Sequence, residues 1–158
     1  MELQGEALLE VAQASATILR GDLQMRESEI IEAVASWFNR EFGAGFFCGE
    51  CRTNAGNRAD LLFVRRADSI HVVEAKARAE DFKGALKQLK GYLANYRWLA
   101  LPRDSYESYG GGIASACSEC GYGLLLVSGK ERHRVEVRRQ PEYIPDRFDN
   151  KWPRAFNR

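Results

Sequence analysis

Two runs of strand-forming residues, 59–64 and about 70–77, constrain this chain more than any other feature of its sequence. Both are rich in aliphatic and β-branched residues, and the short segment between them allows a hairpin with its turn centred near residue 67. Pairing that is symmetric about that residue places Asp60 opposite Glu74. Directly opposed side chains of antiparallel strands lie about 5 Å apart. The hairpin therefore predicts two carboxylates facing each other on one side of a sheet.

A pair of opposed carboxylates needs a compensating cation, because like charges at opposite positions are unfavourable. Mg²⁺ suits such a pair, since it binds one or two protein carboxylates and keeps several waters. Side chains two residues apart in a strand share a face, so Lys76 is expected beside Glu74. An ammonium group there could hold an attacking water and stabilise charge that develops on a phosphate. Metal ion, water and cation together indicate hydrolysis of a phosphodiester.

The other periodic segments predict helices on both faces of a mixed sheet. Helices are expected over about 1–20, over 28–42 with Ser28 as N-cap, over about 82–96, and up to Cys120 with Gly121 after it. Further strands are expected from residue 46, over 98–101, over 124–127 and over 134–137. On the helix after the hairpin, Gln88 and Tyr92 are four residues apart, so they share a face. Their polar ends should lie near the sheet.

Three segments together resemble the PD-(D/E)XK nuclease superfamily: Asn-Arg-Ala-Asp-Leu-Leu at 57–62, Val-Val-Glu-Ala-Lys at 72–76 and Gln-Leu-Lys-Gly-Tyr at 88–92. The Gln-x-x-x-Tyr spacing resembles the RecB-type branch, and residues 58–102 resemble the small MmcB-type DNA repair proteins. The resemblance covers roughly residues 25–130. Ala59 stands where the family signature has proline, and the MmcB-type Lys-Trp-Pro-x-x-Tyr pattern is only partly present at 87–92.

This resemblance implies a fold and a metal site. The fold would be α/β, a restriction-endonuclease-like three-layer α/β/α arrangement with a mixed central sheet, built on a core of αβββαβ with an extra helix and strand. Asp60, Glu74 and the Ala75 carbonyl would bind Mg²⁺ or Mn²⁺, and Lys76 would be the catalytic lysine. The activity would be a metal-dependent nuclease, with DNA as the expected substrate and DNA repair, recombination or defence as its setting.

The resemblance also implies residues that complete the site. Gln88 and Tyr92 would orient the groups bound to the metal or the DNA backbone. The family often adds a carboxylate from the first core helix, for which Glu29 is favoured over Glu32, and Glu50 on the first strand is a third candidate.

Four cysteines form two pairs, Cys48-Gly-Glu-Cys51 and Cys117-Ser-Glu-Cys120, and this pattern raises a zinc site. In the expected sheet the two pairs lie towards opposite edges, so four thiolates would not reach one ion. Buried cysteine acting as a small apolar side chain is the commoner case. His71, on the face opposite Glu74, and His133 have no motif around them and are expected to be structural.

Size and composition set the remaining limits. The chain has 158 residues, 45% hydrophobic and 28% charged residues and a net charge of +1, values typical of a soluble globular domain without a global field for a polyanion. No apolar run is long enough to cross a bilayer, so no membrane partner and a cytoplasmic location are expected. We expect one nuclease domain over 1–139, with residues 1–24 as a helical extension and 140–158 as an irregular basic and aromatic tail.

Several alternatives remain open at this point. The N-terminal helix could pack internally or form a homodimer seam, and the tail could clamp nucleic acid or cover the core. Two other classes of function compete with the nuclease. One is a catalytically inactive module of the same fold that binds DNA or acts as a scaffold, and the other is a zinc-stabilised interaction module that uses the cysteines.

Overall fold

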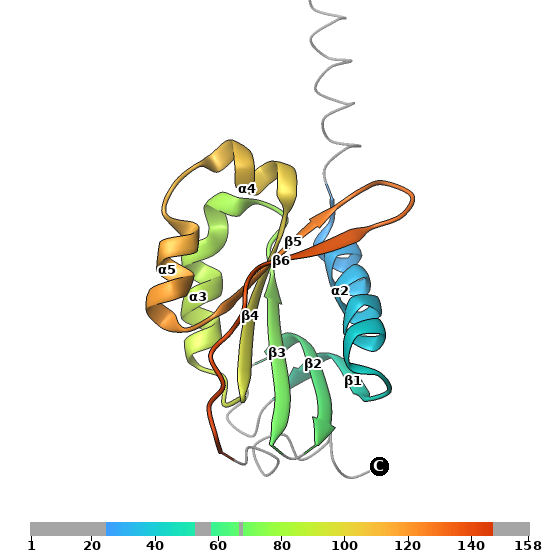
Figure 1. Cartoon of the computed structure of the whole chain (residues 1–158). Coiled ribbons are helices and arrows are strands. Elements are labelled where there is room, and N and C mark those ends of the chain that lie inside the picture. Colours follow the sequence, from blue (N-terminus) through green and yellow to red (C-terminus); the bar gives the residue numbers. More distant parts are fainter. Residues whose placement is uncertain (1–24, 53–57, 67, 147–158) are drawn as a thin grey trace, which may run out of the picture.

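The computed structural model describes residues 25–52, 58–66 and 68–146. Six strands form one mixed sheet in the spatial order β1-β2-β3-β4-β5-β6 (Figure 1). The strands are β1 (Phe46–Arg52), β2 (Arg58–Arg66), β3 (Ser69–Ala75), β4 (Tyr96–Pro102), β5 (Gly123–Ser128) and β6 (Arg134–Arg139). Strands β3, β4 and β5 run parallel, and the other neighbours pair antiparallel. The centre of the sheet is therefore parallel and both its edges are antiparallel.

Helices cover both faces of this sheet (Figure 1). Helix α2 (Glu27–Phe42) lies on one face. On the other face lie α3 (Phe82–Lys90), preceded by the short 3₁₀ turn η1 (Ala79–Asp81), and then α4 (Arg103–Tyr109) and α5 (Ile113–Cys120). The predicted α/β architecture, a mixed sheet with helices on both faces, is confirmed.

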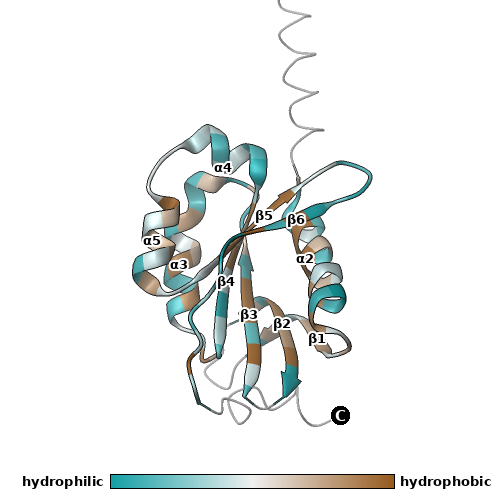
Figure 2. Ribbon diagram, viewed as in Figure 1, coloured by the Kyte–Doolittle hydropathy of each residue, from teal (hydrophilic) through white to brown (hydrophobic). Residues whose placement is uncertain are grey.

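The strands separate two cores because alternate side chains point to opposite faces. On the α2 side, Phe38 stacks on Phe63 with ring centroids 5.1 Å apart, and Trp37 meets Trp98 edge-on at 5.7 Å. The other core is mainly aliphatic, and Leu62, Ile70 and Val72 contribute to it from β2 and β3. Figure 2 shows apolar residues concentrated in the strands, whereas the turn between β5 and β6 is hydrophilic.

The register of the β2–β3 hairpin is the one predicted from the sequence. Leu61 pairs with Val73 and Leu62 with Val72, so the pairing is symmetric about residue 67. Continued by one residue, this register sets Asp60 across from Glu74. A one-residue slip would have moved every apolar side chain of the strand to the other face. The burial of both faces therefore fixes the register that also aligns the two carboxylates.

The helix after the hairpin is shorter than predicted, because α3 ends at Lys90 and does not reach residue 96. The Gly91 N–H donates to the Gln88 carbonyl and the Tyr92 N–H to the Leu89 carbonyl, which closes the helix. Leu93 is 40% exposed. Residues 93 and 96 were expected on the same helix. Residue 93 lies instead in the connection after α3, and residue 96 is the first residue of β4.

Asn95 explains where that connection ends. Its side chain is fully buried, and its Oδ1 accepts a hydrogen bond from the Ile70 N–H at 2.9 Å. Its own N–H donates to the Ile70 carbonyl at 3.0 Å. Asn95 Nδ2 donates to the carbonyls of Ile144 and Asp146 at 2.8 and 2.7 Å. One amide side chain thus joins the start of β3, the start of β4 and the segment after β6.

Two further helix boundaries differ from the predictions. Helix α2 begins at Glu27 with Arg26 as the N-cap, so Ser28 lies inside the helix and the predicted serine cap is wrong. The segment before β5 forms two helices, because Gly110 and Gly112 adopt left-handed backbone with φ of 64° and 63°. Gly121, with φ of 76°, ends α5 after Cys120 as predicted.

Residues 140–146 have no regular secondary structure, as predicted, but they pack on the domain. The N–H of Glu142 donates to the Gly121 carbonyl at 2.9 Å. The Tyr143 hydroxyl donates to the Asp68 carbonyl at 3.1 Å, and its ring lies 5.2 Å from that of Tyr96. This part of the tail covers the core. The predictions on residues 1–24, 54–57 and 147–158, the homodimer seam included, fall outside the described residues.

Candidate functional site

Asp60 and Glu74 meet where β2 begins and β3 ends. Glu74 shares a strand face with Ile70 and Val72, so its side chain lies on the side of the sheet that α3, α4 and α5 cover. Asp60 Oδ2 accepts a hydrogen bond from the Ala75 N–H at 2.9 Å. This bond holds the Asp60 carboxylate against the backbone of β3, beside Glu74.

Burial and the neighbouring acid make Glu74 hard to ionise. Its side chain is 1% exposed. Burial, followed by the hydrogen bond with Asp60 and that residue's charge, raises the pKa of Glu74 from 4.5 to about 8. At neutral pH the carboxyl group therefore keeps its proton, and the two side chains share one negative charge. The Glu74 Oε1 atom is buried and has no hydrogen-bond partner among the described residues.

Tyr92 belongs to the same cluster, although it does not lie on a helix. Its hydroxyl donates to the Arg58 carbonyl at the first residue of β2. The hydroxyl also lies close enough to Glu74 that burial, followed by that contact, raises the pKa of Tyr92. The predicted shared helical face with Gln88 is wrong, because α3 ends between them, and Gln88 is exposed. Tyr92 thus joins the carboxylates without Gln88.

Lys76 follows β3 directly and continues its pairing with β4. Its N–H donates to the Ala100 carbonyl at 3.1 Å, so the backbone stays extended for one more residue. Strand alternation then places Lys76 on the same face as Glu74. Lys76 is half-buried, whereas Glu74 is fully enclosed. The sequence order Glu-Ala-Lys therefore directs Lys76 to the carboxylate side of the sheet, just beyond the end of β3.

The structure does not bring a third acid to this pair. Glu29 lies on α2, which packs on the opposite face, and its carboxylate is 3.9 Å from His133 Nε2. Glu32 is exposed, and Glu50 is 3.8 Å from the Arg58 guanidinium. In the described part of the chain, no three His, Cys, Asp or Glu side chains gather where they could hold a metal ion. The expectation that Glu29 completes the site is therefore not met.

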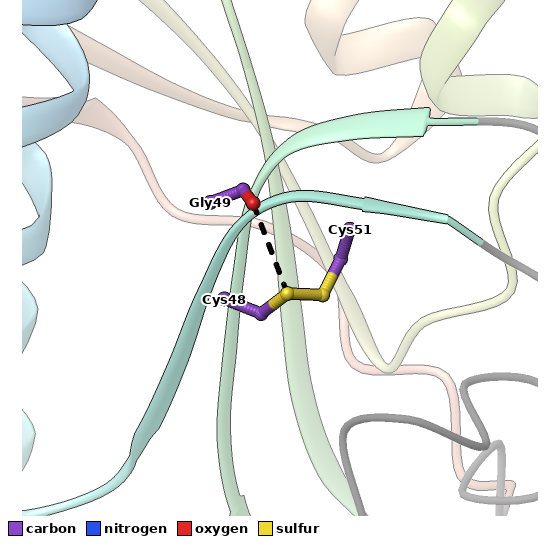
Figure 3. The surroundings of a disulfide bond; sticks show 3 residues. All are labelled: Cys48, Gly49 and Cys51. Atoms are coloured by element: carbon purple, nitrogen blue, oxygen red, sulfur yellow. Dashed lines mark hydrogen bonds between the residues drawn. A yellow bond between two sulfur atoms is a disulfide. The ribbon is translucent and has the colours of Figure 1, made fainter.

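The cysteines do not form a four-thiolate centre. Cys48 and Cys51 are joined by a disulfide on the edge strand β1, with Cα atoms 5.6 Å apart (Figure 3). Cys117 is buried in α5, which packs on the sheet at β5, and Cys120 is exposed. The separation of the two pairs was expected, whereas the disulfide was not. The Cys-x-x-Cys spacing was the signal that could have suggested it.

His71 is structural, as predicted. It is 3% exposed, and Trp98 Nε1 donates to its Nδ1 at 3.0 Å. Burial, followed by the charge of Arg65, lowers its pKa to about 3, so the ring stays neutral. Its ring stacks on Tyr96 at 4.4 Å. His71 therefore packs the core on the α2 side and takes no part in the carboxylate cluster.

Sequence reasoning missed a cavity of about 800 Å³ at the same end of the sheet. Residues that follow β3, β4 and β5 line it together with α4. It begins at Ala77, one residue after Lys76. The walls come from segments far apart in the sequence, so no local pattern could have indicated it.

Comparison with known proteins establishes a fold and no family. No protein-family model matches the chain, and no curated protein matches it. A solved structure similar to this one is SPO1766, a protein of unknown function from Silicibacter pomeroyi. It is 17% identical, with a TM-score of 0.59, over 85% of this chain and 86% of that chain. Among the described residues, no helix is both long and apolar enough to span a bilayer.

Proposed function

We propose that this protein is a metal-dependent nuclease of the PD-(D/E)XK type that hydrolyses phosphodiester bonds, with DNA as its expected substrate. The observation that carries the proposal is the contact between the half-buried Asp60 and the fully buried Glu74, with Lys76 directed by strand alternation to the same face just beyond the end of β3. Burial of a carboxyl group against a second acid is costly to a fold. A divalent cation would offset the negative charge of both carboxylates.

The residues present fit Mg²⁺ or Mn²⁺. Asp60 and Glu74 offer carboxylate oxygens, and Glu74 Oε1 lacks any hydrogen-bond partner within the described chain. The resemblance adds the Ala75 carbonyl as a third protein ligand. Mg²⁺ accepts such a small set because it keeps several waters. When bound, the ion would supply Lewis acidity towards a phosphoryl oxygen and lower the pKa of a bound water.

The other residues of the cluster would hold and balance these ligands. The Ala75 N–H donates a hydrogen bond to Asp60 Oδ2. The Tyr92 hydroxyl, which donates to the Arg58 carbonyl at the start of β2, also contacts Glu74. Lys76 would place a positive charge beside the phosphate and stabilise the charge that develops there. Proton loss from Glu74 would accompany metal binding, because ligand carboxyls must be ionised.

The order of elements supports the finer assignment to a restriction-endonuclease-like fold. Helix α2, the three antiparallel strands β1–β3, helix α3 and the parallel strand β4 follow in the order αβββαβ that the resemblance implies. Helix α5 and strand β5 extend it. The two carboxylates lie at adjoining ends of β2 and β3, where the resemblance requires them.

Cleavage assays on the full-length protein test this proposal. Labelled linear, circular, flapped and branched DNA, with matched RNA, would be incubated with Mg²⁺ or Mn²⁺. Wild-type protein should cut at least one substrate, and Lys76→Ala and Glu74→Ala should lose that activity. Lys83→Ala is the matched control, because Lys83 is exposed on α3 and should cut like wild type. Equal cleavage by the Lys76 variant and wild type would refute the assignment.

One observation favours a second candidate, a module of the same fold that binds nucleic acid without cutting it. The described residues supply two acids to the site rather than three. This candidate predicts that wild-type protein binds DNA, leaves every substrate intact with either metal, and binds equally well after Lys76→Ala.

A further inference from the structure

The cavity beside Lys76 has the size and position of a ligand site. Its volume is about 800 Å³, and pockets for small molecules span about 300–1,000 Å³. It lies beyond the carboxyl ends of the parallel strands β3, β4 and β5, where open α/β sheets commonly bind ligands. Residues of helix α4 and of the turn after β5 line it.

One wall of the cavity suits a flat aromatic ligand. Val127, Pro102 and Met25 supply apolar surface, and Tyr109 supplies a ring that is 43% exposed. This ring is positioned, because it meets Phe82 edge-on with centroids 5.9 Å apart. A positioned and exposed tyrosine beside apolar side chains is a stacking platform for a base.

The charged lining of the cavity leaves one cation for an anionic ligand. Four charged residues line the cavity, namely Arg78, Glu80, Asp104 and Lys130, and Arg78 is paired with Glu80. Lys130 is exposed, and no ion pair to it is found in the described part of the chain. Lys130 is therefore the lining cation that is available to bind a phosphate group.

We propose that this cavity receives an unpaired nucleotide of the substrate strand, next to the phosphate held at Asp60, Glu74 and Lys76. Its base stacks on Tyr109, and its phosphate meets Lys130. The proposal rests on the proposed function, because it treats the cavity and the carboxylate pair as two parts of one nucleic-acid path. It implies preference for single-stranded segments, ends or flaps, because a base-paired nucleotide must leave its stack to enter a pocket.

The test is a binding assay in EDTA, where it does not depend on cleavage. A fluorescein-labelled oligothymidine would be compared with the same strand carrying one abasic site, moved along it position by position. Wild type should bind the intact strand roughly tenfold more tightly than the strand abasic at the sensitive position, as expected for one stacked base. Tyr109→Leu, which keeps the apolar contact with Phe82, should abolish that difference, and Tyr109→Phe should retain it.

Lys130→Ala provides a second, independent variant at an exposed position. It should weaken binding of both strands, whereas Lys83→Ala on the outer side of α3 should not. If Tyr109→Leu binds both strands as wild type does, the cavity is not a base subsite, even if the enzyme cuts DNA. If the base dependence is present but no substrate is cut with any metal, the subsite stands and the nuclease proposal falls. Failure of wild type to bind the intact strand overturns the subsite, and cleavage of any substrate with Mg²⁺ or Mn²⁺ would then leave the nuclease proposal standing.

Discussion

Replacement of Glu74 by glutamine should make the protein more stable at alkaline pH when no divalent cation is present. Glutamine keeps the shape of the side chain and removes its ability to ionise. In the wild type the folded protein holds the Glu74 proton more tightly than the unfolded chain does, because burial and Asp60 oppose its loss. The carboxyl group therefore favours folding at low pH and opposes it once it must ionise.

The size of the effect follows from the pKa difference. Below a pH of about 4.5, folded and unfolded chains both hold the proton, and the contribution of Glu74 is fully present. As pH rises from there to the folded pKa of about 8, each pH unit removes about 1.4 kcal/mol of stability. The full loss is about 5 kcal/mol, of which about 3 kcal/mol falls between about pH 6 and pH 8.

Urea unfolding followed by circular dichroism measures this loss. Wild type and Glu74→Gln would be unfolded in EDTA at several pH values, and free energies obtained by linear extrapolation. The wild-type value should fall below that of the variant by an amount that grows with pH. Glu32→Gln controls for a general charge effect, since Glu32 is exposed on α2. Parallel curves for wild type and Glu74→Gln would refute the reasoning that Glu74 is a buried, proton-holding acid.

The remaining predictions concern the scaffold. Asn95→Ala removes three side-chain hydrogen bonds and leaves buried groups unpaired, so the free energy of unfolding should fall by about 3 kcal/mol. A decrease of less than about 1 kcal/mol in a urea titration would contradict this. Cys48→Ser combined with Cys51→Ser opens a very short loop and should cost about 2 kcal/mol in oxidising buffer. In reducing buffer, wild type and the double variant should have equal free energies of unfolding. A difference that persists in reducing buffer would show that the disulfide is not its cause.

The hairpin could be predicted from the sequence because its information is local. Strand alternation and a short turn fix the register, and the register brings Asp60 and Glu74 together without knowledge of the rest of the fold. Lys76 follows by the same alternation. Helix α2 was also marked by apolar periodicity, and the middle of β4 and of β5 by short apolar runs. The part of the site that lies on neighbouring strands was therefore visible in the chain itself.

The parts that were wrong depend on packing between distant segments. The apolar residue Leu93 concealed the end of α3 at Lys90. The connection after α3 ends at Asn95, whose hydrogen bonds reach β3 and the segment after β6. Glu29 was expected near the carboxylates, but its place depends on how α2 docks on the sheet. The cavity beside Tyr109 joins the ends of three strands with α4. None of these arrangements follows from spacing along the sequence.

The most direct test of the central claim is the binding of Mn²⁺ to the full-length protein, followed by electron paramagnetic resonance of the free ion. Wild type should bind the ion, Asp60→Asn and Glu74→Gln should each lose that binding, and Glu32→Gln should bind like wild type. Loss of the ion from both variants would show that the two opposed acids hold it together. Unchanged Mn²⁺ binding in Asp60→Asn and Glu74→Gln would contradict the account.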